Sequence, residues 1–158
     1  MPQWRIIQPS SEAEWSAYYD LRFSVLRAPW NQPKGSERAS DDPQSIHGLL
    51  LNEQGEALAV GRIHTLSETE AQIRFMAVNP RHRRLGLGKA ILQYLEAMAQ
   101  RRNPELSTIC LQARDSAVPF YISQGYTIKE KTFLLFETIQ HYLMEKPIPQ
   151  IRSSIKPS

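Results

Sequence analysis

The sequence predicts a mixed α/β fold, in which a mostly antiparallel sheet is flanked by helices on both faces. Short apolar segments separated by turn residues fill much of the first half of the chain. Two longer segments have helical features, and a strand–helix–strand crossover follows the antiparallel strands. The chain has 158 residues, of which 41% are hydrophobic and 22% are charged. This length and composition suit one folded domain with an apolar core.

The first predicted elements are a short strand and a capped helix. Residues 5–7, Arg-Ile-Ile, favour a strand. Ser10 or Ser11 begins a helix that runs to about Leu26, because a serine hydroxyl can accept a hydrogen bond from an amide of the first turn. Glu14 lies three residues after Ser11, which is the spacing of a capping box.

A long loop and three strands come next. Residues 28–43 are rich in Pro, Ser, Asp and Asn and predict an irregular loop, a kind of segment that is often functional. Apolar residues at 46–51 and 57–66 predict two strands joined by a hairpin turn at 52–55. Residues 69–78 predict a further strand with side chains on alternating faces. These are Ile73, Phe75 and Ala77 on one face and Arg74, Met76 and Val78 on the other.

The second half of the chain completes the crossover. A helix is predicted over 86–101, because Leu87, Ile91, Leu95 and Met98 form one apolar stripe at helical spacing. The remaining predicted elements are a strand over 108–112, a short helix over 116–124 that ends at Gly125, and two strands from 126 onward, the second over 139–144.

The domain boundaries and the compartment are inferred from composition. A single domain is expected over 1–146 and an extended tail over 147–158, where three prolines cannot continue a central strand. No apolar stretch approaches the roughly 18 residues of a membrane span, and the first residues lack the apolar run of a secretory signal. Cys110 is the only cysteine, so no intrachain disulfide or multi-cysteine metal site can form, and a reducing cytoplasm is expected.

The most specific local signal is a glycine- and arginine-rich turn at residues 79–89. It follows a predicted strand and opens a helix, whose first amides lack hydrogen-bond partners and carry partial positive charge. Gly86 and Gly88 leave room for a phosphate to approach those amides. Its cations, which outnumber the net charge of +3 of the whole chain, are Arg81, Arg83, Arg84 and Lys89. We therefore expect an anion-binding site here.

Two nucleotide-binding motifs fit this turn poorly. A dinucleotide-binding motif needs a third glycine and an acidic residue for the ribose, and neither is in register. A Walker loop needs Ser or Thr after its lysine, whereas Ala90 follows Lys89. A solvated basic helix start is the plain structural alternative.

Residues 83–88, Arg-Arg-Leu-Gly-Leu-Gly, match the Arg/Gln-x-x-Gly-x-Gly/Ala signature of the Gcn5-related N-acetyltransferase (GNAT) superfamily. In the same order and spacing, 73–78 resembles the family's fourth strand, and 117–126 resembles its Ala-x-x-x-Tyr-x-x-x-Gly-Phe/Tyr segment. The resemblance is strong over about 57–145 and looser in the N-terminal third. The ending at 141–146, His-x-x-Met-x-Lys, is similar to that of a bacterial stand-alone group.

The resemblance implies an acetyl-CoA-dependent N-acyltransferase that moves an acetyl group directly to an amine and needs no metal. In the family, acetyl-CoA lies between the fourth and fifth strands, so the backbone of Met76, Ala77 and Val78 would bind its pantetheine arm. Tyr121 would be the general acid for the leaving thiolate, and its structural alternative is a core tyrosine. The residues expected to bind the pyrophosphate are Arg83, Arg84, Leu85, Gly86, Leu87, Gly88 and Lys89.

The acceptor side of the site is less defined. Arg114 stands where many family members carry Asn, and because Arg offers only donors, the contact of that Asn to pantetheine is not transferred. Acceptor-side candidates are Tyr18, Arg22, Arg27, Trp30, Glu37 and His141, although a structural role is commoner for a histidine like His141. The general base is open among Glu37, Asp41, Asp42, His47, His64 and His141.

The predicted partners are acetyl-CoA and an amine, which is either a small molecule or a protein amine. One alternative function is a non-catalytic acyl-CoA-binding sensor on the same fold. A second is a nucleic-acid-binding module that uses the arginine cluster, but the cluster lacks the interleaved aromatic residues of a single-strand binder, so no nucleic-acid partner is expected. The apolar last strands could supply a homodimer interface.

Overall fold

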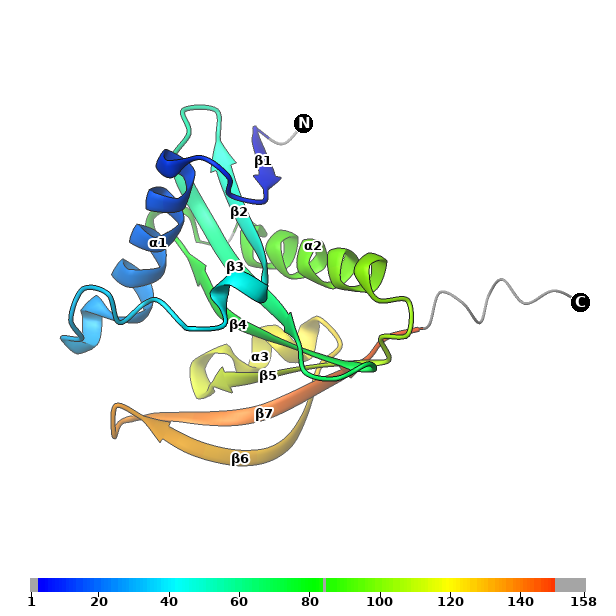
Figure 1. Ribbon diagram of the computed structural model, residues 1–158. Coiled ribbons are helices and arrows are strands. Elements are labelled where there is room, and N and C mark those ends of the chain that lie inside the picture. The colour runs from blue at the N-terminus through cyan, green and yellow to red at the C-terminus, as the bar shows by residue number, and fades with distance from the viewer. Residues whose placement is uncertain (1–2, 84, 150–158) are drawn as a thin grey trace, which may run out of the picture. The chain divides into compact units, whose positions relative to one another are not determined.

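The computed structural model describes residues 3–83 and 85–149, and its strands form one sheet in the order β1-β2-β3-β4-β5-β7-β6 (Figure 1). The sheet is mostly antiparallel, with β4 and β5 parallel, as the sequence predicts. The elements are β1 (Trp4–Ile7), α1 (Glu12–Leu26), β2 (Ile46–Asn52), β3 (Ala57–Thr65), β4 (Glu70–Val78), α2 (Leu87–Arg102), β5 (Thr108–Arg114), α3 (Val118–Ser123), β6 (Thr127–Leu135) and β7 (Ile139–Pro147).

The chain divides into two compact units. The first comprises Met1–Ile63 and Phe75–Met98, and the second comprises His64–Arg74 and Ala99–Ser158. The single domain expected over 1–146 stays a prediction. Among the described residues, no helix is long and apolar enough to cross a membrane.

In the first unit, α1 begins with the predicted capping box. The Ser11 hydroxyl accepts from the Glu14 amide at 3.1 Å, and the Glu14 carboxylate accepts from the Ser11 amide at 3.1 Å. The loop after α1 is irregular apart from 3₁₀ turns at Ala28–Trp30 and Asp42–Gln44, and the hairpin between β2 and β3 turns at Gly55, whose φ is +80°. These local predictions are therefore confirmed.

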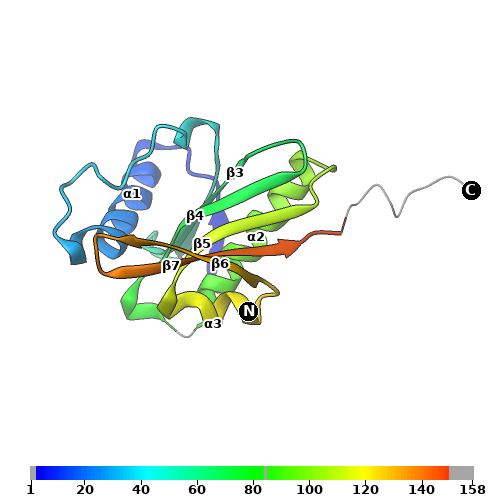
Figure 2. The same ribbon diagram turned by 90° about the horizontal axis from the view of Figure 1, so that it is seen from below.

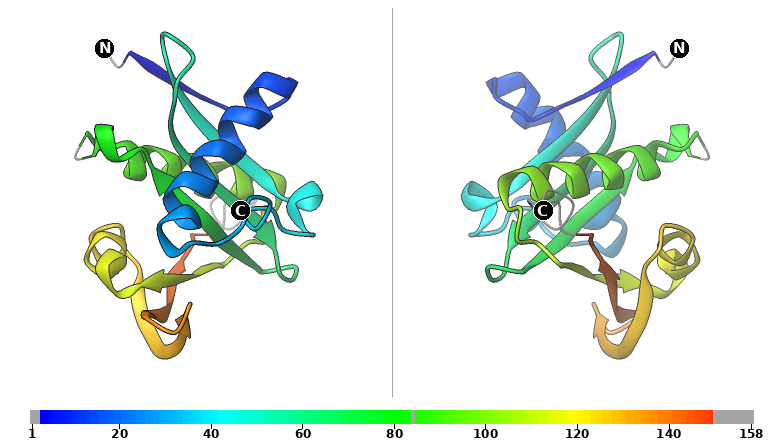
Figure 3. Two further views of the ribbon diagram at one scale, coloured as in Figure 1. Left: turned by 90° about the vertical axis from the view of Figure 1, so that its left-hand side faces the viewer. Right: turned by 90° about the vertical axis from the view of Figure 1, so that its right-hand side faces the viewer.

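Helices α1 and α2 pack on opposite faces of β2 and β3 in the first unit, as the two views of Figure 3 show. Leu49 and Val60, which pair across the two strands, face the aromatic side chains of α1. The next pair, Gly48 and Gly61, lies under α2. Because side chains alternate along a strand, neighbouring residue pairs contact helices on opposite faces of the sheet. The two glycines have no side chain and therefore allow α2 to approach the strand backbone closely.

Gly61→Ala will destabilise the first unit by about 1–3 kcal/mol, the usual cost of overpacking. A Cβ at Gly61 would lie 2.6 Å from the Met76 sulfur and 2.8 and 2.9 Å from side-chain carbons of Ile91 and Leu95, so these three side chains, or the elements that carry them, must shift. Gly48→Ala is the matched control, because its nearest neighbour is the Tyr94 ring edge at 3.2 Å. Urea unfolding of both variants checks the prediction, and equal losses would contradict it.

In the second unit, β7 lies between β5 and β6, and α3 precedes β6 (Figure 2). Gly125, with φ +96°, ends α3 as predicted. A 3₁₀ turn at Asp115–Ala117 precedes the helix, which is shorter than expected. Strand β7 extends to Pro147, and the buried Ile148 donates its amide to the Ser107 carbonyl at 2.8 Å, so order continues past the expected start of the tail.

Candidate active site

The glycine- and arginine-rich turn is anchored to β3 at its start. The Asn79 amide donates to the Leu58 carbonyl at 2.8 Å, and the Asn79 side chain accepts from the Arg81 amide at 3.0 Å. After a 3₁₀ turn at Pro80–His82, Gly86 adopts φ +76° and α2 begins at Leu87. No Cβ at Gly86 would touch other atoms, so the visible requirement for glycine is its left-handed backbone.

The start of α2 has the electrostatics of an anion site. The amides of its first turn have no acceptor within the helix, and the turn contains no acidic residue. Arg81, Arg83 and Lys89 are exposed around it. Leu87 is buried in the core, and this packing fixes the position of the helix start and of its first amides. Arg84, also predicted to bind phosphate, lies outside the described residues.

Strand β4 has an unusual backbone at Phe75, whose φ is +58°. Ile73 and Ala77 are buried as expected, but Phe75 is half-buried, and so are Met76 and Val78. The predicted alternation holds over 75–77, because Phe75 and Ala77 pack on the side of α1 and the Met76 sulfur lies beside Gly61 on the side of α2. A left-handed residue is nevertheless unusual inside a strand. For a residue other than glycine this conformation costs about 1–3 kcal/mol, so neighbouring contacts must stabilise it.

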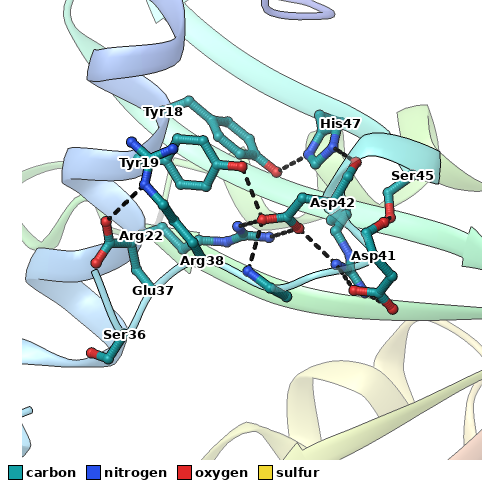
Figure 4. Close-up of polar contacts among 12 residues, drawn as sticks. Tyr18, Tyr19, Arg22, Ser36, Glu37, Arg38, Asp41, Asp42, Ser45 and His47 are labelled. Atoms are coloured by element: carbon teal, nitrogen blue, oxygen red, sulfur yellow. Dashed lines mark hydrogen bonds and ion pairs between the residues drawn. The ribbon is translucent and has the colours of Figure 1, made fainter. Parts of the chain in front are cut away.

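A buried ion cluster lies between α1, the loop before β2, and β3 (Figure 4). Arg22 and Arg62 are both fully buried, and Asp42 is 6% exposed. Arg62 also binds Asp41, with its closest contact at 2.7 Å. The Asp42 carboxylate accepts five hydrogen bonds, from Arg62 Nη1 at 2.6 Å, Arg22 Nη1 at 2.9 Å, Tyr19 Oη at 2.9 Å, the Ala39 amide at 3.0 Å and Arg22 Nη2 at 3.1 Å.

These contacts settle the charge of Asp42. Burial alone raises the pKa of a carboxyl, but hydrogen bonds from Arg22, the Ala39 amide and Arg62 outweigh it and hold the pKa of Asp42 well below its usual range. A carboxylate that is fully engaged and so weakly basic is unsuited to take a proton from an ammonium. Asp42 therefore leaves the set of candidate bases and becomes a structural centre.

His47 is likewise engaged on both ring nitrogens. Its Nε2 lies 2.7 Å from the Asp42 carbonyl, which can only accept, so Nε2 carries the hydrogen. Its Nδ1 then accepts from the Tyr18 hydroxyl at 2.6 Å. Burial lowers the pKa of His47 and raises that of Tyr18, which keeps both groups neutral. This arrangement fits a structural histidine rather than a base.

Glu37 and Trp30, both acceptor-side candidates, lie in the loop of the first unit. Glu37 is 2% exposed, and its carboxylate accepts from the Gly35 amide at 2.8 Å and lies 3.6 Å from Arg38 Nε. Trp30 is half-buried in a 3₁₀ turn closed by Asn31 in the left-handed region. The loop is thus held by internal contacts, and Glu37 is buried within it.

The second unit holds Tyr121, the predicted general acid, on α3. Its ring is buried and packs edge-on against Phe120 and Tyr126, with centroids 5.0 and 5.8 Å away. Burial raises the pKa of Tyr121 well above its ordinary value, and the charge of Arg114 opposes this in part. Its hydroxyl forms no hydrogen bond with any described residue. A neutral phenol with an uncommitted hydroxyl can donate to a developing anion.

Two other residues of the second unit that the sequence singled out, His141 and Cys110, make packing contacts typical of structural residues. His141 pairs with Arg114 across β7 and β5, stacks on Phe133 with ring centroids 4.6 Å apart, and lies 2.9 Å from the Ile139 carbonyl through Nδ1. Cys110 is buried in β5, and burial raises the pKa of its thiol to about 11. Cys110 is therefore the inert core residue that the sequence predicts.

Sequence reasoning named Arg22 and Asp42 separately but missed the cluster that joins them. Arg22 lies four residues after Tyr18 on the buried face of α1, and a charge on an apolar stripe is the signal that could have found it. Its partner is 20 residues away in the loop, which no local pattern indicates. Among the described residues, no group of three or more His, Cys, Asp and Glu side chains is placed to hold a metal ion.

Comparisons with known proteins show the family and the fold of this chain. Residues 12–126 match the sequence model of the acetyltransferase (GNAT) family. Escherichia coli ElaA is similar in structure, with 20% identity and a TM-score of 0.73, over 92% of this chain and 99% of that one. An acyl-CoA N-acyltransferase from Pseudomonas aeruginosa has 20% identity and a TM-score of 0.72, over 90% and 97%. The ribosomal-protein-S18-alanine N-acetyltransferase of E. coli has 20% identity and a TM-score of 0.67, over 92% and 94%.

Proposed function

Because this chain belongs to the acetyltransferase (GNAT) family, we propose that it transfers an acetyl group from acetyl-CoA directly to the nitrogen of an amine acceptor. The observation that carries the proposal is the start of α2. There, a left-handed Gly86 leads into amides that have no acceptor within the helix, beside exposed cations, and no acidic residue lies in the first turn. This arrangement suits the pyrophosphate of acetyl-CoA.

The proposed donor site uses main-chain groups and cations. The amides of Leu87, Gly88 and Lys89 bind the pyrophosphate, with Arg83, Arg84 and Lys89 supplying charge. The backbone of Met76, Ala77 and Val78 binds the pantetheine arm as an added strand would bind. Since these groups are main-chain, half-buried side chains at Met76 and Val78 are compatible with both packing and binding.

In the proposed reaction, a neutral amine attacks the thioester carbonyl, the new C–N bond forms, and the C–S bond breaks. Tyr121 donates its hydroxyl proton to the departing sulfur, which leaves as the thiol of CoA. The nitrogen loses one proton as the amide forms, and this proton passes through water and returns to the Tyr121 oxygen, so that the step balances. The protein otherwise positions the two reactants. The acceptor is an amine of a small molecule or of a protein. The E. coli relative named for ribosomal protein S18 acetylates an alanine, and a protein acceptor here is by analogy only.

Calorimetry with acetyl-CoA and thiol release with a library of amines test this function together. We expect saturable acetyl-CoA binding and turnover with at least one amine. Binding without turnover on any amine would favour the sensor alternative. Neither binding nor turnover would overturn the proposal.

A glycine variant tests the donor site directly. Gly86→Ala will weaken acetyl-CoA binding about ten-fold, because an L-residue disfavours φ +76° by about 1–2 kcal/mol and the turn will reorient the amides. Gly55→Ala is the matched control, since Gly55 has φ +80° in a hairpin and also has open space at Cβ. Both variants should lose similar stability in urea, and only Gly86→Ala should lose affinity. Equal acetyl-CoA affinities would contradict the assignment.

A further inference from the structure

Phe75 has an unusual backbone for its place in the fold. Of the four described residues other than glycine with positive φ, Phe75 alone lies inside a strand; Asn31, Phe136 and Glu137 lie in turns. A strand residue with φ +58° is strained and needs compensating contacts.

The Phe75 ring is held by a buried guanidinium. Arg22 Cζ lies 3.7 Å from the ring centroid, while Arg62 and Arg27 lie farther away at 5.2 and 5.5 Å. Among the described residues, buried Arg22 Nε has no hydrogen-bond partner. The Phe75 ring is nearer to Arg22 Cζ than the rings of Tyr18 and Tyr19, whose centroids lie 5.3 and 5.2 Å away. A desolvated cation over an aromatic face is strongly attracted to it.

The Arg22 guanidinium is in turn oriented by Asp42. Its two Nη atoms bind the two oxygens of Asp42, and Asp42 is fixed by Tyr19, the Ala39 amide and Arg62. A bidentate fork of this kind fixes the guanidinium plane as well as its position. Buried ion pairs contribute little net stability relative to apolar packing, so the clearest consequence of this cluster is the geometry that it fixes.

Through Phe75, the ion cluster contacts β4, the strand that we propose to bind acetyl-CoA. Phe75 immediately precedes Met76, and its left-handed backbone sets the direction in which the peptide groups of Met76–Val78 point. We propose that Arg22 and Phe75 are positioning residues: the guanidinium–ring stack, locked by Asp42, holds β4 in the conformation that presents its backbone to acetyl-CoA. This inference rests on the proposed function.

Phe75→Leu tests the inference, because leucine keeps an apolar side chain but has no ring face for Arg22. We expect the Kd for acetyl-CoA to rise about ten-fold, the equivalent of one desolvated cation–π contact. KM for acetyl-CoA should rise with it, while kcat should change less. In the ligand-free protein, the amides of Met76–Val78 should exchange hydrogen faster, and amides of β2 should not.

Two matched variants separate positioning from general packing. Phe75→Tyr keeps the ring and should restore both Kd and exchange rates to within about two-fold of the parent protein. Phe23→Leu removes a half-buried ring of α1 that faces Lys34 rather than Arg22, and should change neither.

The outcomes distinguish this inference from the proposed function. If the parent protein binds acetyl-CoA but Phe75→Leu binds it equally well, the inference is overturned and the proposed function stands. Unchanged exchange at Met76–Val78 overturns it as well. If the parent protein does not bind acetyl-CoA, the proposed function fails and this inference fails with it.

Discussion

Replacing Tyr121 by phenylalanine will lower kcat about 10²–10³-fold and leave the Kd for acetyl-CoA unchanged, which is the usual scale for loss of a general acid. The ring is already buried against Phe120 and Tyr126, so the variant keeps the packing and loses only the hydroxyl. Thiol release at saturating amine, with calorimetry for binding, measures the two quantities. A variant that turns over as fast as the parent protein would remove Tyr121 from the mechanism.

Burial changes the pKa of Tyr121 and so the pH range over which it can donate a proton. Ordinary phenol and thiol pKa values of about 10 and about 8.5 differ little, and burial moves the pKa of Tyr121 upward. Dry surroundings raise the pKa of a thiol too, as Cys110 shows with about 11. Tyr121 therefore stays protonated throughout the working range, and kcat should show no loss from its ionisation up to about pH 10.

Tyr126→Phe is the matched control for Tyr121→Phe. Tyr126 is buried in the same aromatic contact, and the substitution likewise removes one hydroxyl and no ring. We expect kcat to change less than about three-fold, since this residue has no assigned part in the transfer. A large loss in both variants would indicate a packing effect rather than acid catalysis.

Asp42→Asn will destabilise the protein by about 3–5 kcal/mol at neutral pH, because removal of one partner leaves buried arginine charge uncompensated. The carboxylate carries five hydrogen bonds in the parent protein, four of them from side chains. Urea unfolding measures the loss. Asp20→Asn is the control: Asp20 pairs with Lys34 at the surface, where both side chains are about two-thirds exposed, and its loss should cost less than about 1 kcal/mol.

The effect of Asp42→Asn will also depend on pH. The folded pKa of Asp42 lies below the unfolded value of about 3.9, so the ionised group contributes stability that is fully present above the unfolded pKa. That stability is lost as pH falls toward the folded pKa. The difference between the two proteins should therefore be constant above about pH 5 and shrink below about pH 4. A difference that grows on acidification would contradict the ionised assignment.

The elements and the glycine- and arginine-rich turn could be predicted because their signals are local. Ser11 and Glu14 form a capping box over one turn, the stripe from Leu87 to Leu95 defines the buried face of α2, and the glycine turn is contiguous. Helix starts, strand alternation and tight turns depend on residues within a few positions of each other. The expected extent of most elements was therefore close to the observed one.

The ion cluster and the strain at Phe75 could not be predicted. Asp42 lies 20 residues after Arg22 and 20 before Arg62, and the three meet only when α1, the loop and β3 pack together. Alternation correctly places Phe75 on the same face as Ala77, but no local pattern indicates its positive φ or its contact with Arg22. The sequence by itself determined the elements, the family and the glycine- and arginine-rich turn that we propose to bind phosphate, because short-range spacing encodes them. Only the tertiary structure decided which charges are buried and what fixes β4, because long-range packing sets desolvation and strain.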